Sequence, residues 1–310
     1  MTTSTEKLKT LKTAIPLRPL KGVRILSLAL NLPGPAALMR CQQMGASCVK
    51  LEPLHHPGAP AGTSGDPMGL YNAAAYKELH HRVRITQADL KTENGQKALH
   101  RELAKTDVLL TSFRPSAMVK LGLDWKKLHK LYPQLSFVAI VGAPGPRAEE
   151  PGHDLTYMAE SQLVNGLDLP PTLYADMGGS LMASEAVLQA RLHQLIHGKG
   201  VRLVVALSDA ATYLALPRQW GLTTKGAAVG GGHAGYRVYP CKDGRVALAA
   251  LEPHFAAALG AAVGLPSSNI MAMFAPATHA AVTHFLAGQT RAQLDTLSKE
   301  KDIPLFTLKA

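Results

Sequence analysis

The sequence predicts an α/β protein in which a doubly wound parallel sheet is followed by a smaller α/β domain. Three observations support this prediction. From residue 22 to about residue 207, short apolar runs typical of buried strands alternate with helical patterns. A Gly-rich stretch at residues 221–235 then ends the alternation. The chain has 310 residues, which is long enough to bury a core in each part.

The first repeat begins with a strand at residues 23–30 and a turn, Pro33-Gly34-Pro35. A helix at residues 36–44 and a second strand at residues 47–51 complete one βαβ unit. The turn lacks the Gly-x-Gly-x-x-Gly pattern of dinucleotide-binding loops. A plain tight turn is therefore the favoured interpretation, and a nucleotide-like ligand at Gly34 is the alternative.

The alternation continues through the first two thirds of the chain. Further strands are predicted at residues 83–86, 108–111, 135–141 and 201–207. Further helices are predicted at residues 70–79, 93–104, 124–131, 154–164, 176–196 and 209–216, and a helical segment that ends at residue 121 follows the turn at residues 112–115. Ligands of such sheets bind beyond the carboxyl ends of the strands. Both Arg114 and the loop at residues 142–152 follow strand ends. The forked guanidinium of Arg114 suits a phosphate, and pairing with a surface carboxylate is the alternative.

A Gly152-His153-Asp154 turn leads out of this Pro/Gly-rich loop into a predicted helix. Two acid/base side chains lie side by side where free N–H groups favour negative charge. Asp is also a preferred N-cap residue, and these residues alone favour capping over catalysis. Asp176 lies at the start of the next long helix, where capping is again the simpler interpretation.

The second domain begins with a hairpin of residues 236–240 and 245–250, and Asp243-Gly244 favours a primed turn there. Glu252 follows in the most apolar window of the chain, residues 246–265. The polar residues within this window make it unfit to span a membrane. A carboxylate in such a window needs a cationic or imidazole partner, and His153 would serve. Helices are predicted at residues 253–263, 278–286 and 291–299.

These patterns divide the chain into four parts: a disordered lead-in at residues 1–19, a large domain at 20–205, a linker at 206–235 and a small domain at 236–310. The lead-in lacks the apolar core of a signal peptide. Three cysteines without Cys-x-x-Cys spacing indicate a reducing compartment, and we expect a cytoplasmic protein.

The formal charge of +11 predicts attraction to anions. Because no dense Lys/Arg run with interleaved aromatic residues occurs, nucleic acid is not the expected partner. The histidine pairs His55-His56 and His80-His81 have no partner at helical metal-ligand spacing. We therefore expect no metal site.

Several segments resemble the family III CoA-transferases, and among them most closely the α-methylacyl-CoA racemases. PLKGVRILSL, PGPAALM and MGASCVKLEP resemble the opening βαβ unit of the family, and ADLKTENG, SFRPSAMVKLGLDW and PGHDLTYMA resemble its middle. GGGHAGYRVYPCKDGRVALAALEPHF resembles the start of its small domain. The match runs from Pro19 to the end of the chain.

The resemblance implies a Rossmann-like large domain, a small domain and an interlocked homodimer with an active site between chains. It implies an acyl-CoA substrate and no cofactor beyond the CoA moiety. In the racemase branch His153 works with Glu252 as one acid/base unit, and Asp176 is the other. Arg114 contacts CoA phosphates, and Arg82 and Arg84 are further candidates because they lie in the segment that replaces the family's basic one.

Racemisation explains these residue types. A proton must leave the carbon beside the thioester on one face and return on the other, so two acid/base groups are needed. The enolate formed between these steps needs donors aimed at its oxygen, and the N–H of Asp154 at a helix start is one candidate.

Two alternatives stay open at this point. In a CoA-transferase, the Asp154 carboxylate would attack the acyl-CoA and give a mixed anhydride and then an enzyme thioester. Transferases of the family more usually have Tyr before this Asp and lack Leu-Glu-Pro, so His153 and Glu252 favour the racemase. A CoA-binding paralogue without turnover is the other alternative, because the basic segment at residues 78–84 is altered and the C-terminus is short.

Overall fold

The computed structural model describes residues 17–55, 63–265 and 271–309. Most of the expected lead-in, residues 1–16, lies outside this part. The chain divides into two compact units, Met1–Leu214 and Ala215–Ala310. Helix α9 (Leu207–Leu214), which the sequence placed in the linker, belongs to the first unit and packs against its helices. Each unit is described by itself.

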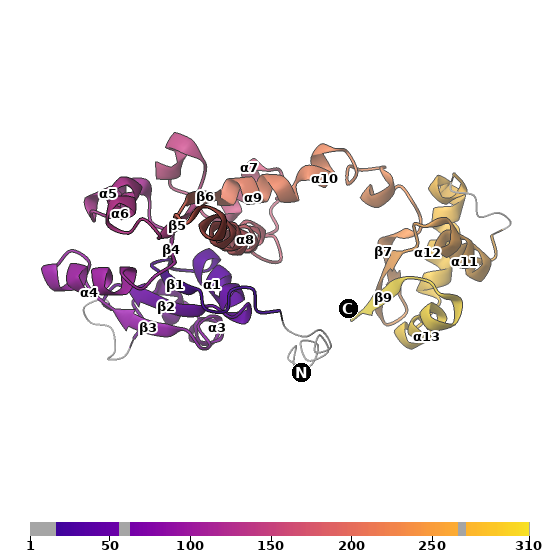
Figure 1. The fold of residues 1–310 in the computed structure, drawn as a ribbon. Helices are drawn as coiled ribbons and strands as arrows, with labels where there is room; N and C mark the ends of the chain where they lie inside the picture. Colours follow the sequence, from indigo (N-terminus) through magenta and orange to yellow (C-terminus); the bar gives the residue numbers. More distant parts are fainter. Residues whose placement is uncertain (1–16, 56–62, 266–270, 310) are drawn as a thin grey trace. The chain divides into compact units, whose positions relative to one another are not determined.

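The first unit is built on one six-stranded sheet (Figure 1). Its strands are β1 (Arg24–Ser27), β2 (Ser47–Glu52), β3 (Arg84–Gln87), β4 (Val108–Thr111), β5 (Ser136–Val141) and β6 (Arg202–Ala206). All pairings are parallel, and the spatial order is β3-β2-β1-β4-β5-β6. This is the order of a Rossmann-type sheet, so the predicted doubly wound fold is confirmed.

Helices cover both faces of this sheet. They are α1 (Pro33–Gln43), α2 (Pro67–Tyr71), α3 (Ala73–Leu79), α4 (Glu93–Leu103), α5 (Pro115–Lys120), α6 (Trp125–Leu131), α7 (Asp154–Glu160), α8 (Tyr174–His197) and α9, with a 3₁₀ turn η2 (Gly145–Glu149). Neighbouring strand residues point to opposite faces. Ile25 joins the core under α1 and α8, and Leu26 joins the core under α4 and α6.

Two helical segments differ from the prediction. The single helix expected at residues 70–79 is α2 followed by α3, because the Asn72 side chain accepts the N–H of Ala75 and starts a new helix. Helix α7 ends at Glu160, short of the expected residue 164, because Gln162 has a φ of 59°, a left-handed conformation that cannot continue a right-handed helix.

The second unit holds a three-stranded antiparallel sheet in the order β7-β8-β9. Its elements are α10 (Leu216–Gln219), η3 (Ala228–Gly230), β7 (Tyr236–Cys241), β8 (Gly244–Ala249), α11 (Pro253–Val263), η4 (Ala272–Phe274), α12 (Pro276–Ala287), α13 (Arg291–Lys301) and β9 (Leu305–Leu308). Residues of the sheet and of helices α11, α12 and α13 share one apolar core. The predicted hairpin and the three helices are present.

The hairpin turn is not primed, which corrects the prediction. Cys241 pairs with Gly244, so the two turn residues are Lys242 and Asp243. Neither has a positive φ, which a primed turn requires. Asp243 instead accepts the N–H of Arg291 at the start of α13, at 2.7 Å. The turn conformation is therefore set together with a tertiary contact.

Among the helices of the described residues, none is both long and apolar enough to cross a membrane.

Candidate active site

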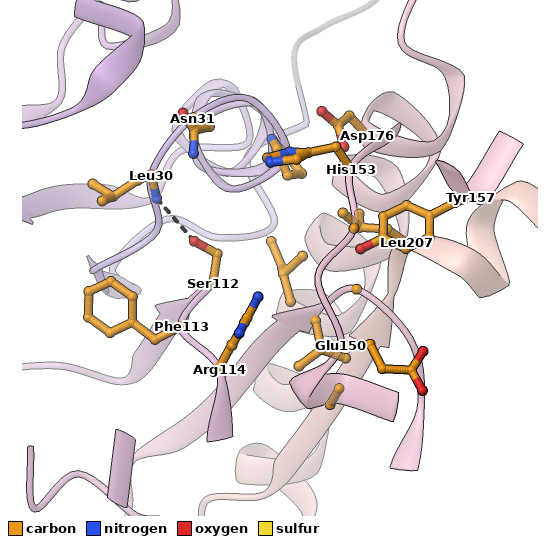
Figure 2. A pocket seen from close by; sticks show the side chains of 16 residues that line it. Leu30, Asn31, Ser112, Phe113, Arg114, Glu150, His153, Tyr157, Asp176 and Leu207 are labelled. Carbon is orange, nitrogen blue, oxygen red and sulfur yellow. Dashed lines mark hydrogen bonds between the residues drawn. The ribbon is translucent and has the colours of Figure 1, made fainter. Parts of the chain in front are cut away.

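A cavity of about 160 Å³ lies beyond the carboxyl ends of β1, β4 and β5 (Figure 2). The strand order reverses between β1 and β4, and this switch point is where open α/β sheets bind ligands. The polar side chains on the cavity wall come from three loops and two helices: Asn31, Ser112, Arg114, Glu150, His153, Tyr157 and Asp176. Three of the residues predicted from sequence, Arg114, His153 and Asp176, are thus brought together.

The β1–α1 turn forms one wall and is held from two sides. The N–H of Leu30 donates to Ser112 Oγ at 3.1 Å. The N–H of Asn31 donates to the carboxylate of Asp66 at 3.1 and 3.2 Å. Asn31 has a φ of 62°, a left-handed conformation that Asn tolerates better than most residues. Sequence reasoning missed Asn31, because one Asn before a Pro-Gly-Pro turn matches no motif.

His153 precedes α7 as its N-cap residue. The hydroxyl of Thr156 accepts the N–H of His153 at 3.1 Å and donates to its carbonyl at 2.7 Å. Because Thr156 satisfies the backbone here, the exposed imidazole of His153 is left to face the cavity. The prediction that Asp154 caps this helix was wrong, since Asp154 is the first helical residue.

The Asp154 side chain caps the next helix instead. Its carboxylate accepts the N–H of Asp176 at 3.0 Å, in the first turn of α8. That N–H has no acceptor within its own helix, so the bond satisfies it. Asp154 is only 4% exposed and is not among the residues that line the cavity. The bond also fixes where Asp176 enters the site.

Asp176 is half-buried on the cavity wall. Burial, and secondly the neighbouring charge of Asp154, raise the pKa of Asp176 to about 7. A carboxyl group with this pKa exchanges protons readily at neutral pH. Asp176 is therefore suited to general acid/base work.

Arg114 is the N-cap residue of α5, directly after β4. Its exposed guanidinium projects into the cavity from the side opposite to His153 and Asp176 (Figure 2). Within the described part of the chain it has no hydrogen-bond or ion-pair partner from a side chain. That freedom suits the phosphate-binding role expected from the sequence, which stays a prediction.

Tyr157 is a wall residue that sequence reasoning missed. Only 6% of it is exposed, and its ring belongs to the core beneath the cavity. A Cβ atom at Gly142 or Gly152 would collide with its hydroxyl group, so both positions need glycine. Tyr157 follows His153 by four residues, and this helical spacing was the available signal.

Within the first unit, Arg82 and Arg84 are not among the residues that line this cavity. Arg84 pairs with Glu102 at 2.8 Å, and Arg82 lies in an exposed turn before β3. Glu252 is exposed at the N-cap of α11, and no side chain in the described residues of its own unit pairs with it. Its pairing with His153 stays a prediction.

Three other residues, Glu52, Asp66 and His80, form a buried group that could hold a metal ion. Sequence reasoning missed it, because the three residues lie far apart along the chain. The Lys50 ammonium already lies among them, 3.0 Å from Glu52 Oε1 and 3.0 Å from His80 Nε2, and it is paired with Asp66. Lysine supplies the positive charge that a metal would otherwise provide.

The imidazole of His80 is oriented by the backbone. Its Nδ1 lies 2.7 Å from the carbonyl oxygen of Tyr76, which can only accept, so Nδ1 carries the proton. Nε2 is then free to accept from Lys50. Burial and the charge of Lys50 lower the pKa of His80, which keeps the ring neutral.

Comparisons with known proteins identify the family and agree with the fold. A model of CoA-transferase family III matches residues 20–309. Alpha-methylacyl-CoA racemase of Mus musculus is 29% identical over 269 residues, which cover 81% of this chain and 66% of the racemase. Cinnamoyl-CoA:phenyllactate CoA-transferase of Clostridium sporogenes is 30% identical over 207 residues, which cover 62% of this chain and 50% of the transferase. The chain thus spans about half to two thirds of the length of these curated relatives.

Solved structures show the same fold. A hypothetical protein from Mycobacterium tuberculosis has a TM-score of 0.77 at 24% identity, with 95% of this chain and 85% of that chain covered. A CAIB/BAIF family protein from Brucella suis has a TM-score of 0.74 at 20% identity, with the same coverage.

Proposed function

This chain belongs to CoA-transferase family III, and from that premise we propose that it racemises or epimerises 2-methyl-branched acyl-CoA thioesters. The reaction is two-base proton transfer at carbon 2. It needs no cofactor beyond the CoA moiety of the substrate.

One observation supports this proposal above the others. His153 and Asp176 both line the cavity, whereas the Asp154 carboxylate is buried and bonded to the N–H of Asp176. A nucleophilic carboxylate must reach the thioester carbon, but an acid/base pair needs only to reach a proton. The pKa of Asp176, about 7, suits a group that both takes and returns a proton.

The roles follow from the chemistry. One of His153 and Asp176 removes the proton from carbon 2, and the electron pair moves onto the thioester oxygen as an enolate. The other residue returns a proton to the opposite face. Glu252 assists His153, and the N–H of Asp154, at the first position of α7, is a candidate donor to the enolate.

Arg114 binds a phosphate of CoA in this proposal, and the net charge of +11 favours the anionic substrate. Arg82 and Arg84 are weaker candidates for the same role, because Arg84 would first have to leave Glu102. The homodimer implied by the sequence resemblance is also part of the proposal. Light scattering on the purified chain tests it.

CoA transfer through Asp154 is the second candidate. It is favoured by the names of several relatives, among them the succinate–glutarate CoA-transferase of Agrobacterium fabrum, 28% identical over 252 residues that cover 74% of this chain and 63% of the relative. Asp154 also directly follows a residue of the cavity wall.

Incubation with a chiral 2-methylacyl-CoA in D2O separates the candidates. Deuterium at carbon 2 and transfer of CoA to an added acid are followed together. Deuterium incorporation without transfer is the expected result. Transfer without incorporation would assign a transferase, and CoA binding with neither activity would assign a paralogue without turnover.

Two substitutions sharpen this experiment. Asp154→Asn keeps an oxygen that can accept the N–H of Asp176, so a racemase retains deuterium exchange and a transferase loses transfer. His153→Ala removes one of the two acid/base groups, and we expect exchange to fall about 100-fold or more. Full exchange by His153→Ala would remove the role assigned to that residue.

A further inference from the structure

The hydroxyl group of Tyr157 has no hydrogen-bond partner in the described part of the chain, although the residue is 94% buried and lines the cavity. The hydroxyl is not one of the buried unpaired atoms of the described residues, so it is accessible from the cavity. Tyr239, which is 4% exposed in the second unit, donates to the carbonyl of Ala234 at 2.7 Å. The Tyr157 hydroxyl is therefore available at the cavity wall to donate a hydrogen bond to a bound ligand.

Its position is central to the proposed chemistry. Tyr157 lies one helical turn after His153, on the same side of α7. Asp176 and Arg114 both act on it electrostatically, so it lies near the other two groups of the site. In Figure 2 the hydroxyl end of the ring is turned toward the middle of the cavity.

The hydroxyl is also held in place. The ring is packed in the core of the first unit, and Gly142 and Gly152 leave just enough space for the hydroxyl. Neither glycine has a positive φ, so the backbone does not require glycine at these two positions. The tyrosine side chain is what excludes a Cβ atom there.

An enolate needs a donor at its oxygen, and the cavity wall offers few. The N–H of Asp154 is one candidate, Arg114 is assigned to a phosphate, and the Tyr157 hydroxyl on the cavity wall can act as a further donor. Burial and the charge of Asp176 raise the pKa of Tyr157, which keeps its proton in place at working pH. A neutral phenol of this kind donates and does not compete as a base.

We propose that the Tyr157 hydroxyl is a catalytic residue that donates a hydrogen bond to the thioester oxygen of a bound acyl-CoA and stabilises the enolate formed from it. The catalytic part of this inference rests on the proposed racemase function. The hydrogen bond itself does not, because any acyl-CoA bound with its thioester in the cavity would accept it.

Tyr157→Phe removes the hydroxyl alone. We expect kcat for deuterium exchange to fall about 100-fold, with KM changed less than about threefold, because the bond strengthens as negative charge develops on the oxygen. Tyr239→Phe is the matched control: it also removes the hydroxyl of a buried tyrosine, and kcat should stay unchanged.

A second readout does not depend on turnover. The probe is 2-methylbutanoyl-CoA labelled with carbon-13 at the thioester carbonyl. The infrared band of its carbonyl stretch is recorded for the free compound, for the compound bound to the wild-type chain and for the compound bound to Tyr157→Phe. A hydrogen bond weakens the carbonyl bond, so the band should move to lower frequency on the wild type and move back in the variant. Gly142→Ala should mimic the variant, because its Cβ displaces the hydroxyl.

The outcomes separate the two proposals. If the wild-type chain exchanges the proton and Tyr157→Phe leaves both kcat and the carbonyl band unchanged, the role of Tyr157 is overturned. The proposed racemase activity is then still supported. A band shift that requires Tyr157, without any exchange, supports the hydrogen bond and overturns the racemase. A wild-type chain that neither exchanges the proton nor shifts the band overturns both.

Discussion

Lys50 is completely buried in the first unit, together with the carboxylates of Glu52 and Asp66. Burying charges is costly unless each has partners, and here the ammonium has two carboxylates and His80 around it. Asp66 also accepts the N–H of Asn31 at the cavity wall. The buried charges thus support the β1–α1 turn at the cavity wall as well as the core.

We expect Lys50→Met to lower the free energy of unfolding by about 3–5 kcal/mol, because it leaves two buried carboxylates without a cation. Urea unfolding measures the loss. Lys97→Met is the control. Lys97 pairs with Glu93 on the exposed face of α4, and loss of this ion pair should barely change the urea concentration at the midpoint of unfolding. Equal effects of the two substitutions would contradict the structural role of Lys50.

The pKa of Asp176 predicts a pH dependence. When Asp176 acts as the base it must be ionised, so kcat/KM for the enantiomer it deprotonates should rise as pH increases through about 7. Asp154→Asn removes a like charge and lowers the pKa of Asp176, which moves this rise to lower pH. Initial rates of deuterium exchange between pH 5 and 9 measure both. An inflection at the same pH in both proteins would exclude the influence of Asp154.

At the scale of elements, the site depends on how α7 and α8 begin. Thr156 caps α7 and leaves His153 free, and Asp154 of α7 caps α8. Each helix start is therefore fixed by a side chain of α7. This arrangement couples the positions of the two proposed acid/base residues, His153 and Asp176.

Thr156→Ala should lower the free energy of unfolding by about 1 kcal/mol and also reduce exchange, because the backbone of His153 loses its cap. Thr92→Ala removes a similar cap from α4, where Thr92 accepts the N–H of Gly95 at 3.1 Å. It should cost about the same stability and leave exchange unchanged. Thermal unfolding and deuterium exchange test the pair, and equal exchange rates in both variants would argue against the coupling.

At the scale of the whole molecule, the proposal that Glu252 assists His153 predicts how substitutions of the two residues combine. If the two act as one acid/base unit, their substitutions are not additive. We expect His153→Ala and the double variant with Glu252→Gln to exchange deuterium at the same rate, while Glu252→Gln alone is slower than the wild type. Additive losses in the double variant would show that the two residues act independently.

The sequence alone determined the order of strands and helices and three residues of the cavity, Arg114, His153 and Asp176. Apolar periodicity follows from local burial, and these residues lie in short motifs at strand or helix ends, so both signals are local. Strand β9 was missed because four residues at the end of the chain carry too little pattern.

Only the tertiary structure decided which way the side chains of the site face. The Asp154 carboxylate turns to α8, Tyr157 fits between Gly142 and Gly152, and Lys50 lies among groups from three separate segments. These contacts join residues that are distant along the chain, and a carboxylate or a hydroxyl has the same local pattern whichever partner it finds. The physical reason is that such partners are defined only by tertiary packing, which brings distant segments together.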